Sequence, residues 1–144
     1  MRESIKAFFS LLHCGHLKPS GYRTLRHTFS RGMSDYTERV QFQGSSWNDA
    51  DCASTFYINF GVEFVGIPAR TPDRDFPETH RWTRIEHIIR DAPKQYDIPE
   101  SDLPAFAVEI AACVASASEA AARHISRLRS DYERTHVPRL TIQT

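Results

Sequence analysis

Histidine and cysteine side chains cluster near the N-terminus, where His13, Cys14 and His16 fall within four residues. Imidazole and thiolate groups are common zinc ligands, but a structural or catalytic metal needs three or four ligands that converge. Only a distant residue such as Cys52 or His27 could complete this set. We therefore interpret the cluster as the ordinary end of a helix, and we expect neither a bound metal nor another cofactor.

A second group of residues with acid–base chemistry lies in the middle of the chain, where Glu86 and His87 are adjacent. Glu78, His80 and Asp91 are nearby, so a general acid and a general base could be drawn from this stretch. Neighbouring residues on a strand point to opposite faces, so Glu86 and His87 would not act together there. Neither a G-x-S-x-G elbow nor a phosphate-cradling loop accompanies them. We expect a solvated charged segment and no catalytic residues.

Arginines alternate with aromatic residues around a proline-rich segment. The residues concerned are Arg70, Arg74, Phe76, Arg81, Trp82 and Arg84. Charge and stacking of this kind can bind single-stranded nucleic acid. However, acidic residues lie among the arginines, and the 18 basic and 18 acidic residues of the chain cancel, so no general attraction to phosphates is expected. Nucleic-acid binding is therefore the weakest of the functions that we consider.

The most informative stretch runs from Thr55 to Val65, where apolar residues occupy every second position from Phe56 to Phe64. This alternation predicts a β-strand with one buried face and one wetter face. The stretch Val40–Gln43 alternates in the same way. Its density of apolar residues makes Thr55–Val65 the expected central strand of a sheet.

If the apolar residues of these strands face helices, the opposite face carries amide, phenol and carboxylate groups in a row beside Gly61. Arg81 and Arg84 follow the predicted loop Pro68–His80, which could line that face. The predicted binding residues are Gln41, Gln43, Tyr57, Asn59, Glu63, Arg81 and Arg84. Amides and aromatics on a rigid platform suit partner binding better than catalysis. The alternative is a sheet face that meets only water.

The remaining elements follow from periodicity. Ile5, Phe8 and Leu12 predict an amphipathic helix over residues 3–16. Strands are predicted over Arg23–Arg31, Tyr36–Gln43 and Thr55–Val65. Residues 81–90 fit either a fourth strand or a short helix, and we favour the strand. The expected fold is α+β, an antiparallel sheet of about four strands with the N-terminal helix and a long C-terminal helix packed on one face.

The C-terminal helix is expected to begin at a cap formed by Ser101 or Asp102. An apolar stripe from Phe106 to Tyr132 covers about seven turns, and alanine in its middle would let the helix approach its neighbour closely. The same stripe could join two copies, so both a monomer and a homodimer are open. Residues 135–144 are expected to form a loose tail.

A chain of 144 residues with 40% apolar residues predicts a single domain over residues 1–144. Its three cysteines are odd in number and widely spaced, which argues against disulfides and for a reducing cytoplasm. The N-terminus does not read as a signal peptide, and no apolar run approaches the roughly 20 residues of a membrane helix. We expect a cytoplasmic protein that does not contact a membrane.

Four short motifs occur in a recognisable order. They are Leu17-Lys-Pro-Ser-Gly-Tyr22, His27-Thr-Phe-Ser-Arg31, Val40-Gln-Phe-Gln43 and Phe56-Tyr-Ile-Asn-Phe-Gly-Val62. Together they resemble the bacterial family catalogued as domain of unknown function 4304. The resemblance covers about residues 5–65, is weaker around residues 81–89 and is absent from the C-terminal helix. It implies a fold rather than an activity, because the biochemistry of that family is unassigned.

Small bacterial α+β domains of this sort often resemble immunity proteins that neutralise a toxin, which is an argument by analogy. We therefore expect a non-enzymatic protein that recognises a macromolecular partner, most concretely an immunity or antitoxin protein with a cognate toxin. The competing hypothesis is a small hydrolase or transferase that acts on a polar small molecule between the loop Pro68–His80 and the sheet.

Overall fold

The computed structural model describes residues 3–25, 27–44, 55–64 and 82–136. The predicted loop Pro68–His80 and the predicted binding residue Arg81 lie outside these ranges. The elements in chain order are α1 (Glu3–Leu12), the π-helical turn η1 (His13–Leu17), β1 (Arg23–Leu25), β2 (Thr28–Gly32), β3 (Tyr36–Gln43), β4 (Thr55–Phe64), β5 (Trp82–Arg84), the 3₁₀ turn η2 (Ile85–His87), β6 (Tyr96–Asp97), α2 (Leu103–Arg123) and α3 (Ile125–His136).

The sheet is an antiparallel meander in which β1 to β5 lie side by side in chain order, and β6 pairs with the start of β4. Each pair of neighbouring strands is antiparallel. In this register Gln41 of β3 lies opposite Asn59 of β4, and Asn59 lies opposite Arg84 of β5. The predicted α+β class and antiparallel sheet are confirmed, with strands slightly more numerous than the four expected.

Two of the predicted strands differ from the observed ones. The segment predicted as one strand, Arg23–Arg31, forms the two strands β1 and β2, which pair with each other as a tight hairpin. The segment of residues 81–90 was predicted as either strand or helix. Its described part holds both, because the three residues of β5 lead directly into η2.

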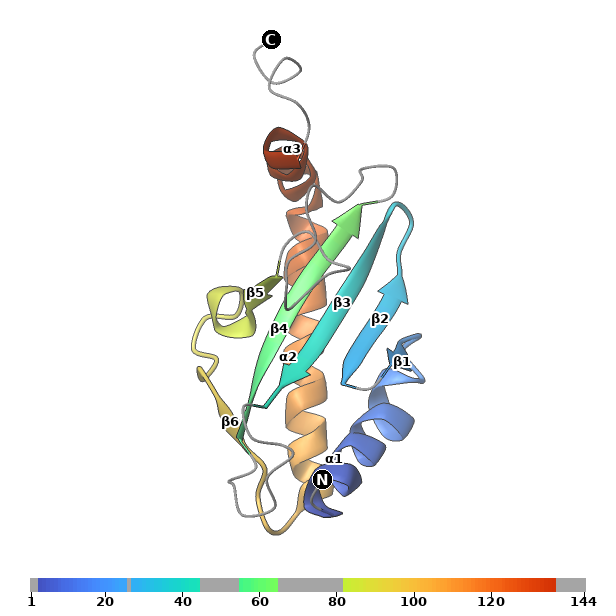
Figure 1. The fold of residues 1–144 in the computed structure, drawn as a ribbon, viewed down its shortest axis with the longest axis vertical. Coiled ribbons are helices and arrows are strands. Elements are labelled where there is room, and N and C mark those ends of the chain that lie inside the picture. The colour runs from blue at the N-terminus through green and yellow to red at the C-terminus, as the bar shows by residue number, and fades with distance from the viewer. Residues whose placement is uncertain (1–2, 26, 45–54, 65–81, 137–144) are drawn as a thin grey trace.

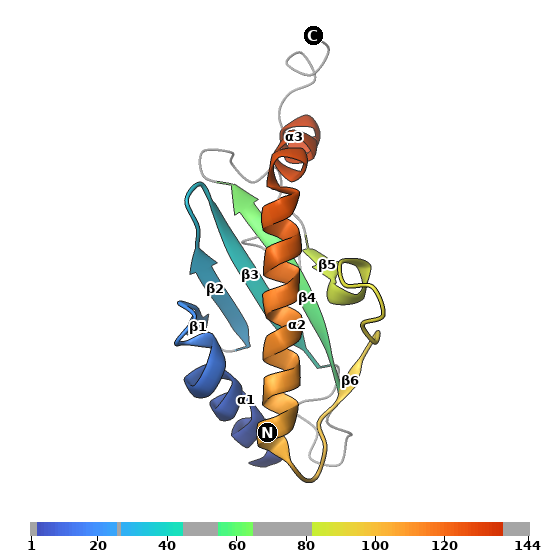
Figure 2. The ribbon, with the colours of Figure 1, turned by 180° about the vertical axis from the view of Figure 1, so that it is seen from behind.

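The helices α1 and α2 cover the same face of the sheet, which is the arrangement predicted from the sequence (Figure 1; Figure 2). Along β3, buried and half-buried residues alternate without a break, as expected for a strand with one face against a core. The core joins both layers: the Phe8 ring of α1 stacks on the Phe56 ring of β4 at 5.5 Å between centroids. Burial of each such ring contributes about 2 kcal/mol or more to stability.

The long C-terminal helix is confirmed in its first part and corrected in its second. The stripe residues Ile110, Val114 and Ala117 are buried as predicted. The helix then breaks at His124, and α3 continues in a new direction to His136. The predicted side-chain cap is also wrong, because Asp102 has a left-handed backbone and its side chain makes no capping hydrogen bond.

Of the tail predicted for residues 135–144, residues 135–136 belong to the end of α3, and residues 137–144 lie outside the described ranges. By length and composition alone, α2 is also apolar enough to cross a membrane, although the sequence analysis found no such segment. A third of its apolar window (33%) is buried inside the protein, and core helices meet the same criterion.

Candidate functional site

The strands bring five of the seven predicted binding residues into one connected group. The side-chain amide of Asn59 donates two hydrogen bonds, to Oε1 of Gln41 and to Oε1 of Gln43, each 3.0 Å long. Arg84 donates from Nη1 to the same oxygen of Gln43 at 3.2 Å. Its guanidinium carbon also lies 4.2 Å from the centroid of the Tyr57 ring. We call this group, Gln41, Gln43, Tyr57, Asn59 and Arg84, the polar sheet face.

The position of the polar sheet face follows from strand alternation. Gln41 and Gln43 alternate on β3 with Val40 and Phe42, which are buried beneath the helices, so the two amides project from the opposite side. Asn59 is only 3% exposed, although it belongs to this side. A buried amide is costly unless its hydrogen bonds are made, and the two glutamines accept them. The network therefore holds the face in one geometry.

The predicted residue Glu63 lies further along β4 and is not linked to this group. It accepts from Nε and Nη2 of Arg39, each at 3.3 Å. Both side chains are partly exposed, so the pair contributes at most about 1 kcal/mol to stability. Arg39 lies on the same face of β3 as Gln41, but it was not among the predicted binding residues.

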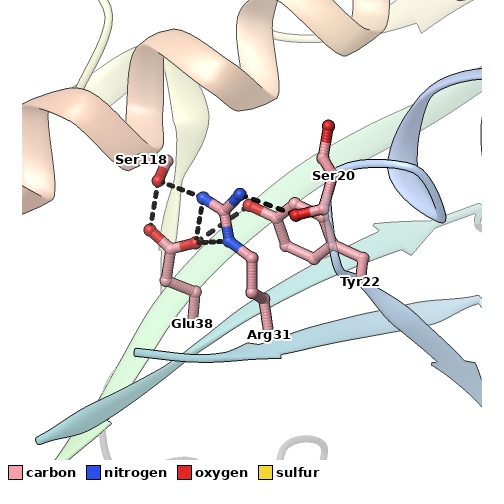
Figure 3. A network of polar contacts seen from close by, with 5 residues as sticks. All are labelled: Ser20, Tyr22, Arg31, Glu38 and Ser118. Atoms are coloured by element: carbon pink, nitrogen blue, oxygen red, sulfur yellow. Dashed lines mark hydrogen bonds and ion pairs between the residues drawn. The ribbon is translucent and has the colours of Figure 1, made fainter. Parts of the chain in front are cut away.

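A second polar network lies on the helix side of the sheet and was not predicted. Glu38 of β3 is fully buried, with 0% exposure. Its carboxylate accepts from the Tyr22 hydroxyl at 2.9 Å and from Nε and Nη2 of Arg31 at 3.1 and 2.9 Å. The hydroxyl of Ser118 in α2 donates to its other oxygen. Figure 3 shows these groups together with the Ser20 carbonyl, which accepts from Nη1 of Arg31 at 3.0 Å. We call this set the Glu38 network.

The Glu38 network ties a turn, two strands and α2 together. The Arg31 guanidinium lies 4.5 Å from the centroid of the Tyr22 ring. Burial, followed by the negative charge of Glu38, raises the pKa of Tyr22 well above its ordinary value of 10.0. Tyr22 therefore stays a neutral hydrogen-bond donor over the physiological range. A buried carboxylate that accepts from three side chains holds those side chains in position.

A pocket of about 440 Å³ lies beside the Glu38 network, between α2 and the segment that links η1 to β1. Tyr22, Arg31 and Ser118 line it, whereas Glu38 does not. The competing enzyme hypothesis from the sequence requires a different pocket, next to the loop Pro68–His80, which lies outside the described residues. The described pocket and the polar sheet face thus lie on opposite sides of the sheet.

A family profile described as "Domain of unknown function (DUF4304)" matches residues 15–111, about two thirds of the chain. The chain belongs to the DUF4304 family. The match runs from η1 into the first half of α2, further than the sequence resemblance had indicated. Comparison with curated proteins and with solved structures gives no match. Membership of the DUF4304 family therefore names no activity for this domain.

Part of the Glu38 network carried a signal in the sequence. Glu38 lies two residues before Val40 and four before Phe42, so alternation along β3 puts it on the same buried face. Its carboxylate therefore occupies a position where a core residue is expected. Tyr22 and Arg31 close two of the motifs that carry the DUF4304 resemblance. Ser118 gave no such signal, because nothing in an alanine-rich helix indicates which serine meets a strand 80 residues earlier.

The other predicted clusters do not come together within the described ranges. Cys14 is exposed, the His13 ring lies 5.6 Å from the Phe29 ring, and His16 lines the pocket. No group of three metal-binding side chains was found among the residues that the structure describes. In η2, His87 is exposed, and Oε1 of Glu86 is buried with no hydrogen-bond partner among the described residues.

Proposed function

We propose that this DUF4304 domain is a non-enzymatic binding protein that recognises a protein partner through its polar sheet face. The supporting observation is the connected geometry of that face, in which Asn59, Gln43 and Arg84 hold one another. Side chains that are fixed before binding lose less conformational entropy when a partner arrives. Tyrosine and arginine, here stacked as Tyr57 and Arg84, are also the residue types that contribute most to protein interfaces.

The chemistry of the face favours a partner that presents oxygen acceptors. Arg84 and the two glutamines carry N–H donors, and the charge of Arg84 is not matched by a carboxylate within the polar sheet face. Glu63, which lies further along β4 on that side, is paired with Arg39. Main-chain carbonyls or a carboxylate of a partner would complement such a surface. The most concrete version is an immunity or antitoxin protein that binds a cognate toxin.

A small hydrolase or transferase is the alternative carried over from the sequence. It requires a pocket between the loop Pro68–His80 and the sheet, where Glu63, Glu86 or a histidine meets other polar groups. Within the described residues, Glu63 pairs with Arg39 on the sheet face and Glu86 lies in η2, so the two carboxylates are on different elements. We therefore place the alternative second. The cytoplasmic location and the choice between monomer and homodimer remain predictions from the sequence.

The immunity proposal is tested by co-expression with a toxin. We expect a toxin gene next to the gene of this domain, and we expect the domain to restore growth when both are expressed. The variant Arg84→Ala should lose protection, because it removes the cation stacked on Tyr57 and the bond to Gln43. Arg123→Ala, which removes an exposed arginine from α2, is the matched control and should protect fully. The proposal fails if the wild-type domain neither restores growth nor co-purifies with the toxin.

A further inference from the structure

The pocket beside the Glu38 network has the size and the mixed lining of a small-molecule site. Its volume of about 440 Å³ falls within the range of such sites. Leu17, Ala111 and Ala115 supply an apolar wall, while Ser20 and Arg31 supply polar groups. The hollow exists because the side chains that α2 presents there are short.

The other wall of the pocket is shaped by the π-helical turn η1. Lys18 donates its backbone N–H to the carbonyl of His13, five residues earlier, at 2.8 Å. This wider turn places His16 and Leu17 at the pocket, and π-turns occur frequently at functional sites. Gly21 follows with φ of +97°, a backbone conformation that glycine adopts most readily, and the turn passes close to the Arg31 side chain.

Arg31 is held rigidly at the pocket before any ligand arrives. Its four hydrogen bonds to described residues go to Glu38, Ser118 and the Ser20 carbonyl (Figure 3). A guanidinium has five N–H groups, so one N–H on Nη1 makes no hydrogen bond to a described residue. A fixed donor of this kind orients a ligand at little entropic cost.

The charges around the pocket argue against an anionic ligand. Arg31 is paired with Glu38 at 2.9 Å, which offsets its positive charge. Glu119 lines the pocket and adds a carboxylate. The charges of Arg31, Glu38 and Glu119 sum to one negative charge. Phosphates and other anions would therefore be repelled, whereas a neutral molecule with a carbonyl oxygen would not.

We propose that this pocket binds a small uncharged amide, with its carbonyl oxygen accepting from Arg31 and its aliphatic body against Ala111 and Ala115. An N-acylated amide of a hydrophobic amino acid, or a dipeptide capped at both ends, has this chemistry and fits the volume. The site lies on the helix side of the sheet, so it is separate from the polar sheet face. Failure of one proposal leaves the other standing.

The test is an NMR titration of the ¹⁵N-labelled domain with N-acetyl-leucinamide and with N-acetyl-leucine. The two probes share one aliphatic body and differ only in a carboxamide against a carboxylate. We expect saturable shifts of the Leu17, Ala111 and Ala115 amides with the neutral probe, and roughly fivefold weaker binding of the anionic probe. Equal or tighter binding of the anionic probe would overturn the charge argument, and no saturable shift with either probe would overturn the site.

Three variants test where the probe binds and how charge affects its binding. Ala115→Phe fills the pocket from an exposed position and should weaken binding of the neutral probe by about tenfold or more. Ala122→Phe places the same ring on an exposed position of α2 outside the lining and should bind like the wild type. Glu119→Gln removes a negative charge from the pocket wall and should therefore reduce the difference in affinity between the neutral and the anionic probe. Unchanged binding by Ala115→Phe would place the probe elsewhere and contradict the proposal.

Discussion

At the scale of single residues, Glu38 is the buried acid at the centre of the network that joins β2, β3 and α2. It has no exposed surface, and it accepts from the side chains of Tyr22, Arg31 and Ser118. Loss of one member of a buried ion pair leaves the other as an uncompensated charge, which costs more than the pair itself contributes. The network therefore acts as an all-or-none unit, and its effects are measurable as stability.

We expect Glu38→Gln to lower the free energy of unfolding by about 3 kcal/mol, because Arg31 keeps its charge without a counter-charge. Urea denaturation followed by circular dichroism measures this. Glu63→Gln, which breaks the partly exposed pair with Arg39, is the matched control and should cost less than about 1 kcal/mol. Equal losses for the two variants would show that the buried pair is not the stronger one.

The raised pKa of Tyr22 predicts how the stability of the domain changes at alkaline pH. Its folded-state pKa is raised above the ordinary value of 10.0, chiefly by burial and then by Glu38. At pH values below 10.0, the ordinary pKa, the folded and the unfolded chain both keep the tyrosine proton, so the full stability is present. Above it the unfolded chain releases the proton and the folded chain does not, so stability falls as the pH rises, by up to about 1.4 kcal/mol per pH unit.

The alkaline prediction is tested by urea denaturation at several values between about pH 9 and pH 11. Tyr36 and Tyr96 also have raised pKa values, mainly through burial, so the wild type should lose stability through all three tyrosines. Tyr22→Phe should be less stable at neutral pH but should lose less on going to alkali. A variant with the same alkaline slope as the wild type would exclude Tyr22 as a cause.

The residue types on the polar sheet face were foreseeable, whereas their contacts were not. Period-two alternation placed Gln41, Gln43, Tyr57 and Asn59 on one side, and the structure brings them together. Arg84 joins them because β5 pairs with β4, and that pairing follows from the tertiary fold rather than from local sequence. The same holds for Ser118, which meets Glu38 only after α2 has docked on the sheet.

At the scale of elements, long periodic segments were predicted well and short ones were not. The strands β3 and β4 and the helix α1 follow directly from their apolar spacing. The hairpin of β1 and β2 turns near His27 without a glycine or proline to indicate it. The break at His124 also lacks such a residue. After this break, a tertiary contact helps to position α3, because Arg129 donates to Asp35 of the β2–β3 turn at 3.1 Å.

The small residues of α2 have a consequence that can be measured. Ala117 has no exposed surface, so a larger side chain there has no space without moving α2. We expect Ala117→Leu to lower the free energy of unfolding by about 1–3 kcal/mol through overpacking. Ala122→Leu on the exposed side should change it by less than about 0.5 kcal/mol. If thermal and urea denaturation found Ala117→Leu neutral, the close approach of α2 would be wrong.

At the scale of the whole molecule, the two sides of the sheet in this DUF4304 domain carry different kinds of side chain. The helices bury the apolar side of the sheet and, with the Glu38 network, form the pocket on that side. The opposite side carries the polar sheet face over the central strands. Alternation in the sequence predicted the apolar and polar sides of the sheet, but not the pocket or the Glu38 network, and the DUF4304 match names no activity. Neither source identifies the partner, because recognition depends on groups that the partner supplies.

The central claim is that the polar sheet face, and not the helix side, meets the partner. Isothermal titration of the purified domain with its cognate toxin tests it most directly. We predict that Arg84→Ala raises the dissociation constant by about tenfold or more, as removal of a central arginine at an interface does. Arg123→Ala on α2 should leave it unchanged. The reverse pattern, with Arg123→Ala weakening the complex and Arg84→Ala binding like the wild type, would contradict the account.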